Sequence, residues 1–273
     1  MKAALRTEYR KLVTTRMWWI LLLSMAAYMA FLAGIMAFAL TQKPASMSAG
    51  LTGGGPVTVM TPEAVARIIY TLATSLGYVF PLIVGAMAMT SEFRHQTITP
   101  TLLAEPRRTV FLTAKMLSSV VVGLVFGVVG TIATVGAGAG VLALMGKPTY
   151  LTDPIVMRSA VLSVLALTVW TVVGVGFGAL VTNQVAVIVI VLAFTQFMEP
   201  ILRIVLGLFD WSRGISKFLP GAAGEAITGS SFYADSGMSA GLLSSGLGLA
   251  VLLGYAIVFA LVARVTTLRH DIT

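Results

Sequence analysis

Side chains that could do chemistry are few in this sequence. Its 273 residues include ten Asp or Glu and two His, and it has no Cys. His95 and His270 stand far apart in the sequence, and no His-Glu-x-x-His pattern occurs, so neither a zinc protease nor a thiolate metal site is predicted. We therefore assign no catalytic residue and no metal ligand, and we do not expect the chain to be an enzyme.

One ionisable pair lies inside a long apolar stretch. Glu199 and Arg203 are four residues apart, so on a helix they share a face and can form an ion pair. Pro200 removes one backbone N–H and can kink that helix. Charged groups at membrane depth are costly and often functional. Two interpretations stay open: a pair that lines a pathway or a dimer seam, and a structural pair near the outer interface from which Arg203 snorkels.

The elements that must position these residues are membrane helices. The sequence is 58% hydrophobic and 10% charged, with a mean hydropathy of +0.96, whereas a soluble domain carries about 25% charged residues. The apolar runs are unbroken, which excludes the alternating pattern of a membrane β-barrel. The net charge of +8 is better explained by membrane topology than by nucleic acid, so no nucleic-acid partner is expected.

Charge-free windows predict six spans in a single transmembrane domain, residues 1–273. The spans lie at about 17–40, 66–90, 115–144, 157–181, 185–208 and 238–263. The fourth and fifth share one uncharged window, 159–198, which as one helix would be about 60 Å long, twice the hydrocarbon thickness. The polar cluster Thr182-Asn183-Gln184 is therefore expected to form a tight hairpin between them.

The basic residues predict the orientation. Eleven of the 18 fall on one side of the six spans: Lys2, Arg6, Arg10, Lys11, Arg16, Arg94, Arg107, Arg108, Lys115, Arg264 and Arg269. The positive-inside rule then places both termini of this multi-pass protein in the cytoplasm. The first apolar run is too long for a signal peptide, so it is expected to remain as an uncleaved span.

A short segment before the first span has helical periodicity. Leu5, Tyr9, Leu12 and Val13 fall on one face of a helix over residues 3–16, with charged residues off that face. Such a helix lies at the membrane surface on anionic lipid. A second interpretation is that it also contacts a cytoplasmic partner.

The loop between spans two and three is the most specific segment. In order along it come a Glu, a basic residue, a Thr-Ile pair, a Leu pair, a Pro and two further basic residues: Glu92, Arg94, Thr97, Ile98, Leu102, Leu103, Pro106, Arg108 and Lys115. This order resembles the membrane subunits of type-2 ABC transporters, the exporter-type permeases. The opening residues Glu8, Lys11, Leu12, Arg16 and Trp18 also resemble that family, whereas Pro100 and Arg107 depart from its pattern.

The resemblance implies an all-α integral membrane fold with six transmembrane helices and three further parts. The first is an N-terminal amphipathic interfacial helix with the site residues Glu8, Arg10, Lys11, Leu12 and Arg16. The second is a cytoplasmic coupling helix that docks on an ATPase through Glu92, Phe93, Arg94, Gln96, Thr97, Ile98, Pro106, Arg107 and Arg108. The third is a re-entrant outer segment before span six, with an outer gate at Phe218, Leu219 and Pro220.

The function implied is that of a permease subunit of an ATP-driven exporter. It would work as a dimer with an identical copy or a paralogue, in contact with membrane lipids. Two separate ATPase subunits would bind ATP and Mg²⁺; this chain itself has no cofactor, because its one Gly-Lys pair, Gly146-Lys147, lacks the other P-loop residues.

Two other functions stay open beside the exporter. One is a membrane component of a sensing or immunity complex that uses the same ATPase docking without net transport. The less favoured one is an ion-coupled carrier, because Glu199 stands almost alone within the spans and a relay of buried acidic groups is missing. The sequence does not name a substrate.

Overall fold

The computed structural model describes residues 17–42, 61–104, 107–209, 211–235 and 241–267. Across these ranges the regular structure is helical. The helices are α2 (Met17–Gln42), α4 (Pro62–Ser75), α5 (Val79–Arg94), α6 (Ile98–Ala104), α7 (Arg108–Leu144), α8 (Pro154–Leu180), α9 (Gln184–Ala193), the π-helix η1 (Phe194–Met198), α10 (Glu199–Leu208), α11 (Arg213–Ser216), α12 (Pro220–Thr228), α13 (Phe232–Asp235) and α14 (Ser245–Val265). The predicted interfacial helix, with Glu8, Arg10, Lys11, Leu12 and Arg16, lies outside the described residues, as does Pro106.

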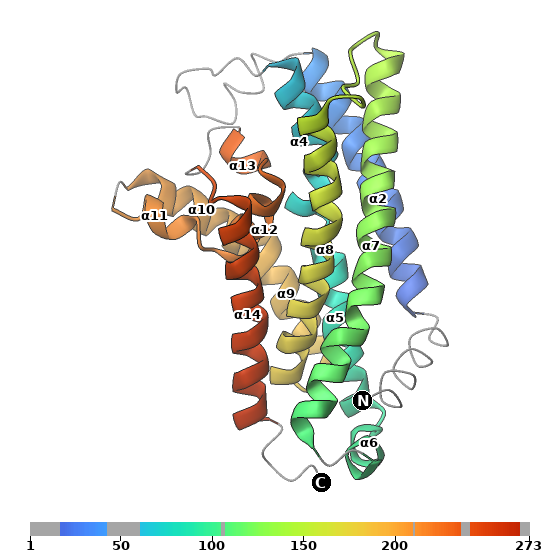
Figure 1. Ribbon diagram of the computed structural model, residues 1–273, viewed down its shortest axis with the longest axis vertical. Helices are drawn as coiled ribbons and strands as arrows, with labels where there is room; N and C mark the ends of the chain where they lie inside the picture. The colour runs from blue at the N-terminus through green and yellow to red at the C-terminus, as the bar shows by residue number, and fades with distance from the viewer. Residues whose placement is uncertain (1–16, 43–60, 105–106, 210, 236–240, 268–273) are drawn as a thin grey trace.

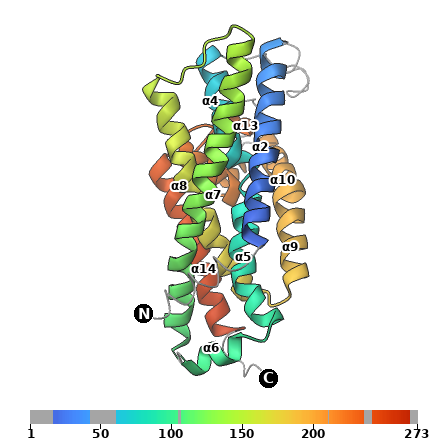
Figure 2. The same ribbon diagram turned by 90° about the vertical axis from the view of Figure 1, so that its right-hand side faces the viewer.

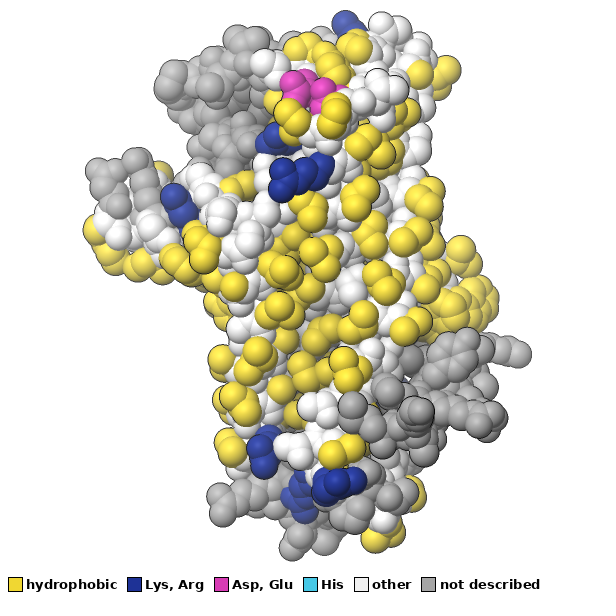
Figure 3. Space-filling model, viewed as in Figure 1, with side chains coloured by type: hydrophobic (Ala, Val, Ile, Leu, Met, Phe, Trp, Pro, Cys, Tyr) yellow, Lys and Arg dark blue, Asp and Glu magenta, His cyan; other side chains and the backbone are white. Residues whose placement is uncertain are grey.

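Six helices are long and apolar enough to cross a membrane, as the sequence predicts. They run over Trp18–Gln42, Pro62–Arg94, Arg108–Leu144, Pro154–Leu180, Gln184–Leu208 and Ser245–Val265. The long helices lie roughly along the long axis of the molecule (Figures 1 and 2). Hydrophobic side chains cover the middle of the face in Figure 3, with Lys and Arg above and below them. This is the surface of a multi-pass membrane protein.

Helix α8 is the centre of the bundle, because it packs against α4, α5, α7, α12 and α14. Glycines allow the closest of these contacts. A Cβ atom on Gly174 would lie 2.1 Å from the carbonyl oxygen of Leu82 in α5, and one on Gly85 would lie 2.0 Å from that of Thr171 in α8. Small residues therefore bring these two backbones together, as is typical of membrane helices.

Replacing Gly174 by Ala is expected to destabilise the bundle by about 1–3 kcal/mol, because the added methyl group forces α5 and α8 apart. The matched control is Gly140→Ala in α7, where an added Cβ would have no atom within 4 Å. The control gains helix propensity and should unfold at the same temperature as the parent protein or higher. Thermal unfolding in detergent compares the two; equal melting temperatures would mean that the α5–α8 contact tolerates the extra atom.

Two of the spans are interrupted, and both interruptions face the same region. The second span breaks at Leu76–Tyr78 between α4 and α5, which the sequence analysis did not predict. The fifth span contains η1 directly before Pro200. Proline lacks an N–H and crowds the preceding turn, and a π-turn is one way to relieve that conflict. The kink predicted from Pro200 therefore takes the form of a π-helical turn.

The hairpin predicted at Thr182-Asn183-Gln184 joins α8 to α9. The side chain of Asn183 accepts hydrogen bonds from the backbone N–H groups of Val185 and Ala186 and so caps α9. At the other end of this span the chain turns aside through α10 and α11 (Figure 1) and returns as α12. Residues 221–228 of α12 are all buried, packed on α4, α8 and α14.

Candidate functional site

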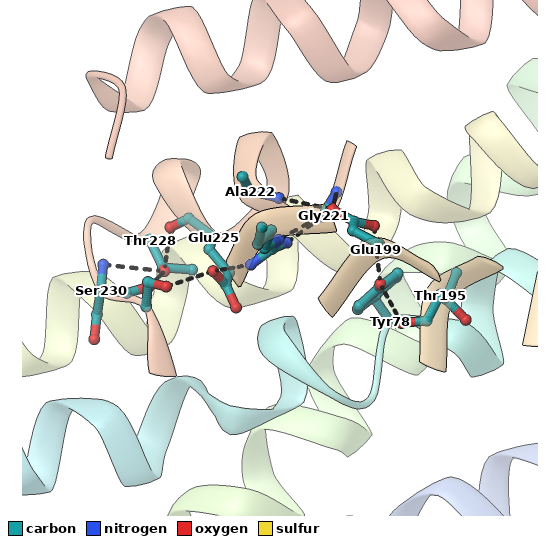
Figure 4. A network of polar contacts seen from close by, with 10 residues as sticks. Tyr78, Thr195, Glu199, Gly221, Ala222, Glu225, Thr228 and Ser230 are labelled. Atoms are coloured by element: carbon teal, nitrogen blue, oxygen red, sulfur yellow. Dashed lines mark hydrogen bonds and ion pairs between the residues drawn. The ribbon is translucent and has the colours of Figure 1, made fainter. Parts of the chain in front are cut away.

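A buried ion pair forms the centre of the polar network drawn in Figure 4. The Nε and Nη2 atoms of Arg203 donate to Oε1 of Glu199 at 3.2 and 2.9 Å. Both residues lie in α10, and both are about 2% exposed or less. The pair predicted from the i, i+4 spacing is therefore formed, and Arg203 does not snorkel to the surface.

Glu199 also holds the beginning of α12. Its Oε1 accepts hydrogen bonds from the backbone N–H groups of Gly221 at 2.6 Å and Ala222 at 3.2 Å. Leu219 is at the N-cap position of α12, and its apolar side chain cannot accept a hydrogen bond from these N–H groups. The carboxylate therefore acts as the cap, where its charge also complements the positive end of the helix dipole. A Cβ atom on Gly221 would lie 2.5 Å from Oε1, so glycine is needed at this approach.

Both interruptions of the spans contribute to the same network. The hydroxyl group of Tyr78, in the break between α4 and α5, donates to Oε2 of Glu199 at 3.3 Å. The ring of Tyr78 stacks on Trp170 of α8, with ring centroids 4.4 Å apart. The break in the second span thus turns a tyrosine towards the carboxylate that follows the π-turn.

Glu225 completes the network, and the sequence analysis missed it. Its Oε2 accepts from Nη1 of Arg203 at 2.7 Å and from the hydroxyl group of Ser231. The ring of Tyr233 covers the guanidinium group, 5.0 Å from its central carbon. The one sequence feature that could have indicated Glu225 is that it is the single acidic residue in the Gly- and Ala-rich run 221–228.

The network holds more acidic than basic groups. Two carboxyl groups share one guanidinium group, all three deeply buried. Burial raises the pKa of the Glu225 carboxyl above its ordinary 4.5, while Arg203 and Ser231 act in the opposite direction. Oε1 of Glu225 makes no hydrogen bond of ordinary geometry within the described part of the chain, although the nearby Ser75 hydroxyl group also acts to lower the pKa of this carboxyl. Burial likewise raises the pKa of Tyr233 to about 12, so its hydroxyl group stays neutral.

A second buried ion pair lies at the end of the bundle that carries α6. Nζ of Lys115 in α7 is 2.8 Å from Oε1 of Glu92 in α5, and both side chains are at most 4% exposed. The hydroxyl group of Thr97 donates to Oε2 of Glu92 at 2.6 Å. This geometry does not suit the prediction that Glu92 makes a polar contact with an ATPase, because the carboxylate is enclosed and already paired within the chain.

The other residues predicted to couple to an ATPase divide into buried and exposed sets. Ile98 is buried in a small apolar cluster with Met89, Phe111 and Leu112, so it too is not a surface anchor. Phe93, in part buried, packs against that cluster. The exposed residues of the predicted set are Arg94, Gln96, Thr97 and Arg107, and Arg108 is partly exposed.

The residues predicted as an outer gate lie next to the buried network. Leu219 and Pro220, at the start of α12, also close one end of an apolar cavity between α5, α8, α9, η1 and α14. Phe218 is half exposed, and its carbonyl oxygen accepts a hydrogen bond from the Tyr255 hydroxyl group of α14. These three residues therefore join the polar network, the cavity and the last span.

Comparison of the sequence with models of protein families gave no match, and comparison with curated proteins gave none either.

Proposed function

We propose that this chain is the transmembrane permease subunit of an ATP-driven exporter of the type-2 ABC class, located in the bacterial cytoplasmic membrane. The observation that carries the proposal is the ordered set of residues from Glu92 to Lys115, which resembles that family. Six membrane-crossing helices and a short helix between the second and third of them are compatible with it. ATP and Mg²⁺ would bind to two separate ATPase subunits, and a second permease copy or a paralogue would complete the pathway.

Helix α6 is the proposed docking element. It joins α5 to α7 at one end of the bundle (Figure 1), near the hairpin before α9, where Arg94 donates to the side chain of Gln184. Leu103 of α6 is 79% exposed. An exposed apolar side chain is the kind of anchor that can fill a pocket on a partner protein. In this proposal α6 and both chain termini lie in the cytoplasm.

The proposed coupling follows from what α6 is attached to. Glu92 and Lys115 tie its two neighbours, α5 and α7, together, so a push on α6 is passed to both helices. α5 also packs against α8 and α9, which line the cavity below α12. Movement of α5 would shift the start of α12, which acts as the outer gate in a re-entrant position.

The proposed docking is tested by co-purification from the native cell with Leu103→Glu. We expect a Walker-motif ATPase to co-purify with the parent protein in stoichiometric amounts and to be lost with this variant. The matched control is Leu144→Glu at the opposite end of α7, where the side chain is 88% exposed; this variant should retain the ATPase.

Absence of any ATPase from the parent protein under several mild conditions would contradict the proposal. ATPase binding without ATP-dependent movement of substrate in vesicles would favour the sensing complex over the exporter.

A further inference from the structure

An apolar cavity lies beside the polar network and takes no part in its hydrogen bonds. The cavity has a volume of about 290 Å³ and lies among α5, α8, α9, η1 and α14. Leu82 of α5 and Trp170 and Val173 of α8 form its buried inner wall, and Leu219 and Pro220 close the end towards the ion network. Its volume is at the lower end of the roughly 300–1,000 Å³ usual for ligand pockets.

The lining offers a ligand almost no polar contact. None of the lining side chains is charged. The Thr195 hydroxyl group already donates a hydrogen bond to the backbone oxygen of Val191 at 2.7 Å. The Tyr255 hydroxyl group likewise donates to the backbone oxygen of Phe218 at 3.1 Å. The indole nitrogen of Trp170 is directed at α12, because a Cβ atom on Gly224 would lie 2.6 Å from it. A ligand must therefore be hydrocarbon where it fills this space.

The mouth of the cavity opens towards the lipid-facing surface. The inner wall is buried, whereas Ile190 of α9 is 44% exposed, and Tyr255 and Phe259 of α14 are partly exposed. The outward residues beside the mouth, Val189 and Ile257, are apolar and more than half exposed. At this depth the surrounding solvent is hydrocarbon. The molecules that can enter sideways are therefore the chains of lipids.

We propose that this cavity binds one hydrocarbon chain of an amphiphile that enters sideways from the bilayer between α9 and α14. The site has room for part of one chain and not for a whole phospholipid. The inference names a substrate class for the proposed exporter, a molecule with an acyl-type chain, and to that extent it rests on the proposed function. Binding of the chain itself requires no ATPase, so the two proposals fail separately.

Trp170 provides a direct probe of occupancy, because it lines the cavity and is only 2% exposed. A variant with Trp18, Trp19 and Trp211 replaced by Phe has Trp170 as its single tryptophan. In vesicles of phosphatidylcholine brominated in the middle of its acyl chains, we expect loss of most of the Trp170 fluorescence. Val173→Phe fills the cavity and should restore the emission.

The matched control for Val173→Phe is Val189→Phe, which adds the same side chain at the lipid-facing rim, where the residue is 58% exposed. It should leave the quenching of Trp170 unchanged. Equal quenching with and without the cavity-filling substitution would overturn the proposal, and so would absence of quenching in the parent variant.

A second measurement uses the parent protein, so it tests the proposal even if the triple-Phe variant does not fold. The parent protein is irradiated in vesicles that contain a phosphatidylcholine with a diazirine in one acyl chain. Labelling of peptides around Phe177 and Phe259, which line the cavity, is expected and should be lost with Val173→Phe. Labelling confined to outward-facing residues, or a mouth closed by cross-links to a second copy of the chain, would contradict the proposal.

Discussion

Replacing Arg203 by Met is expected to cost about 3–5 kcal/mol of stability, because it leaves two buried carboxylates without their cation. Glu199 and Glu225 are each about 1% exposed, and both depend on the guanidinium group. The end of α12 that Glu199 caps should loosen as well. Thermal unfolding in detergent and hydrogen exchange of residues 220–228 measure the two effects.

The expected loss comes from unpaired charge and not from lost packing, which a second substitution tests. Adding Glu199→Gln and Glu225→Gln to Arg203→Met removes all three charges, so most of the lost stability should return. The control Arg158→Met removes an exposed arginine at the beginning of α8 and should change the unfolding temperature little. A triple variant as unstable as Arg203→Met alone would show that the packing of the arginine, not its charge, holds α12.

The two carboxyl groups of this network bind different parts of the chain. Glu199 binds Arg203, the α12 backbone and Tyr78, whereas Glu225 binds Arg203 and Ser231 through one oxygen. Glu199 therefore joins three segments of the chain: α10, the break in the second span and the start of α12. Glu225 links α12 to Arg203 of α10 and to Ser231 just beyond the end of α12. A segment held in this way can stay in place or be released as a unit, as an outer gate requires.

The helices could be predicted from sequence because each depends on local composition. Charge-free windows identify the six spans, and the hairpin follows from the length of the uncharged window and the polar cluster Thr182-Asn183-Gln184 inside it. Glu199 and Arg203 could be paired because four residues on one helix make them neighbours. In each case the residues that interact are close in sequence.

The parts that could not be predicted depend on packing between distant segments. Arg203 and Glu225 are 22 residues apart and Glu92 and Lys115 are 23 apart, and no periodicity links either pair. The resemblance implies that Glu92 contacts an ATPase, which would require an exposed carboxylate. The structure encloses it because α5 extends to Arg94 and α7 begins at Arg108, which makes both residues parts of neighbouring helices. The break at Leu76–Tyr78 contains Gly77 and is followed by Pro81, which has no N–H to bond the carbonyl of residue 77, but the charge-free window runs through both residues and does not mark the break.

Replacing Lys115 by Met is the second substitution with a large expected effect, about 3–5 kcal/mol, because it leaves Glu92 charged and buried. The ammonium group is 2% exposed and 2.8 Å from the carboxylate. Since Glu92 also holds Thr97 just before α6, the segment 95–104 should lose its protection from hydrogen exchange. Arg264→Met, at an exposed position at the end of α14, is the matched control and should leave this segment protected.

Exchanging the two residues of this ion pair distinguishes an internal role of Glu92 from direct contact with the proposed ATPase. In the exchange variant Glu92→Lys/Lys115→Glu the two charges can still pair within the chain, although the hydrogen bond from Thr97 changes. If the proposed ATPase docks on α6 and Glu92 acts by holding that helix, the exchange should recover much of the stability that Lys115→Met loses, and it should allow the ATPase to bind. If Glu92 contacts the ATPase itself, the exchange reverses the charge that the ATPase meets, and binding stays lost while stability returns. The burial of Glu92 favours the first result, in which the proposed contacts with an ATPase would come from Leu103 and from exposed residues such as Arg94.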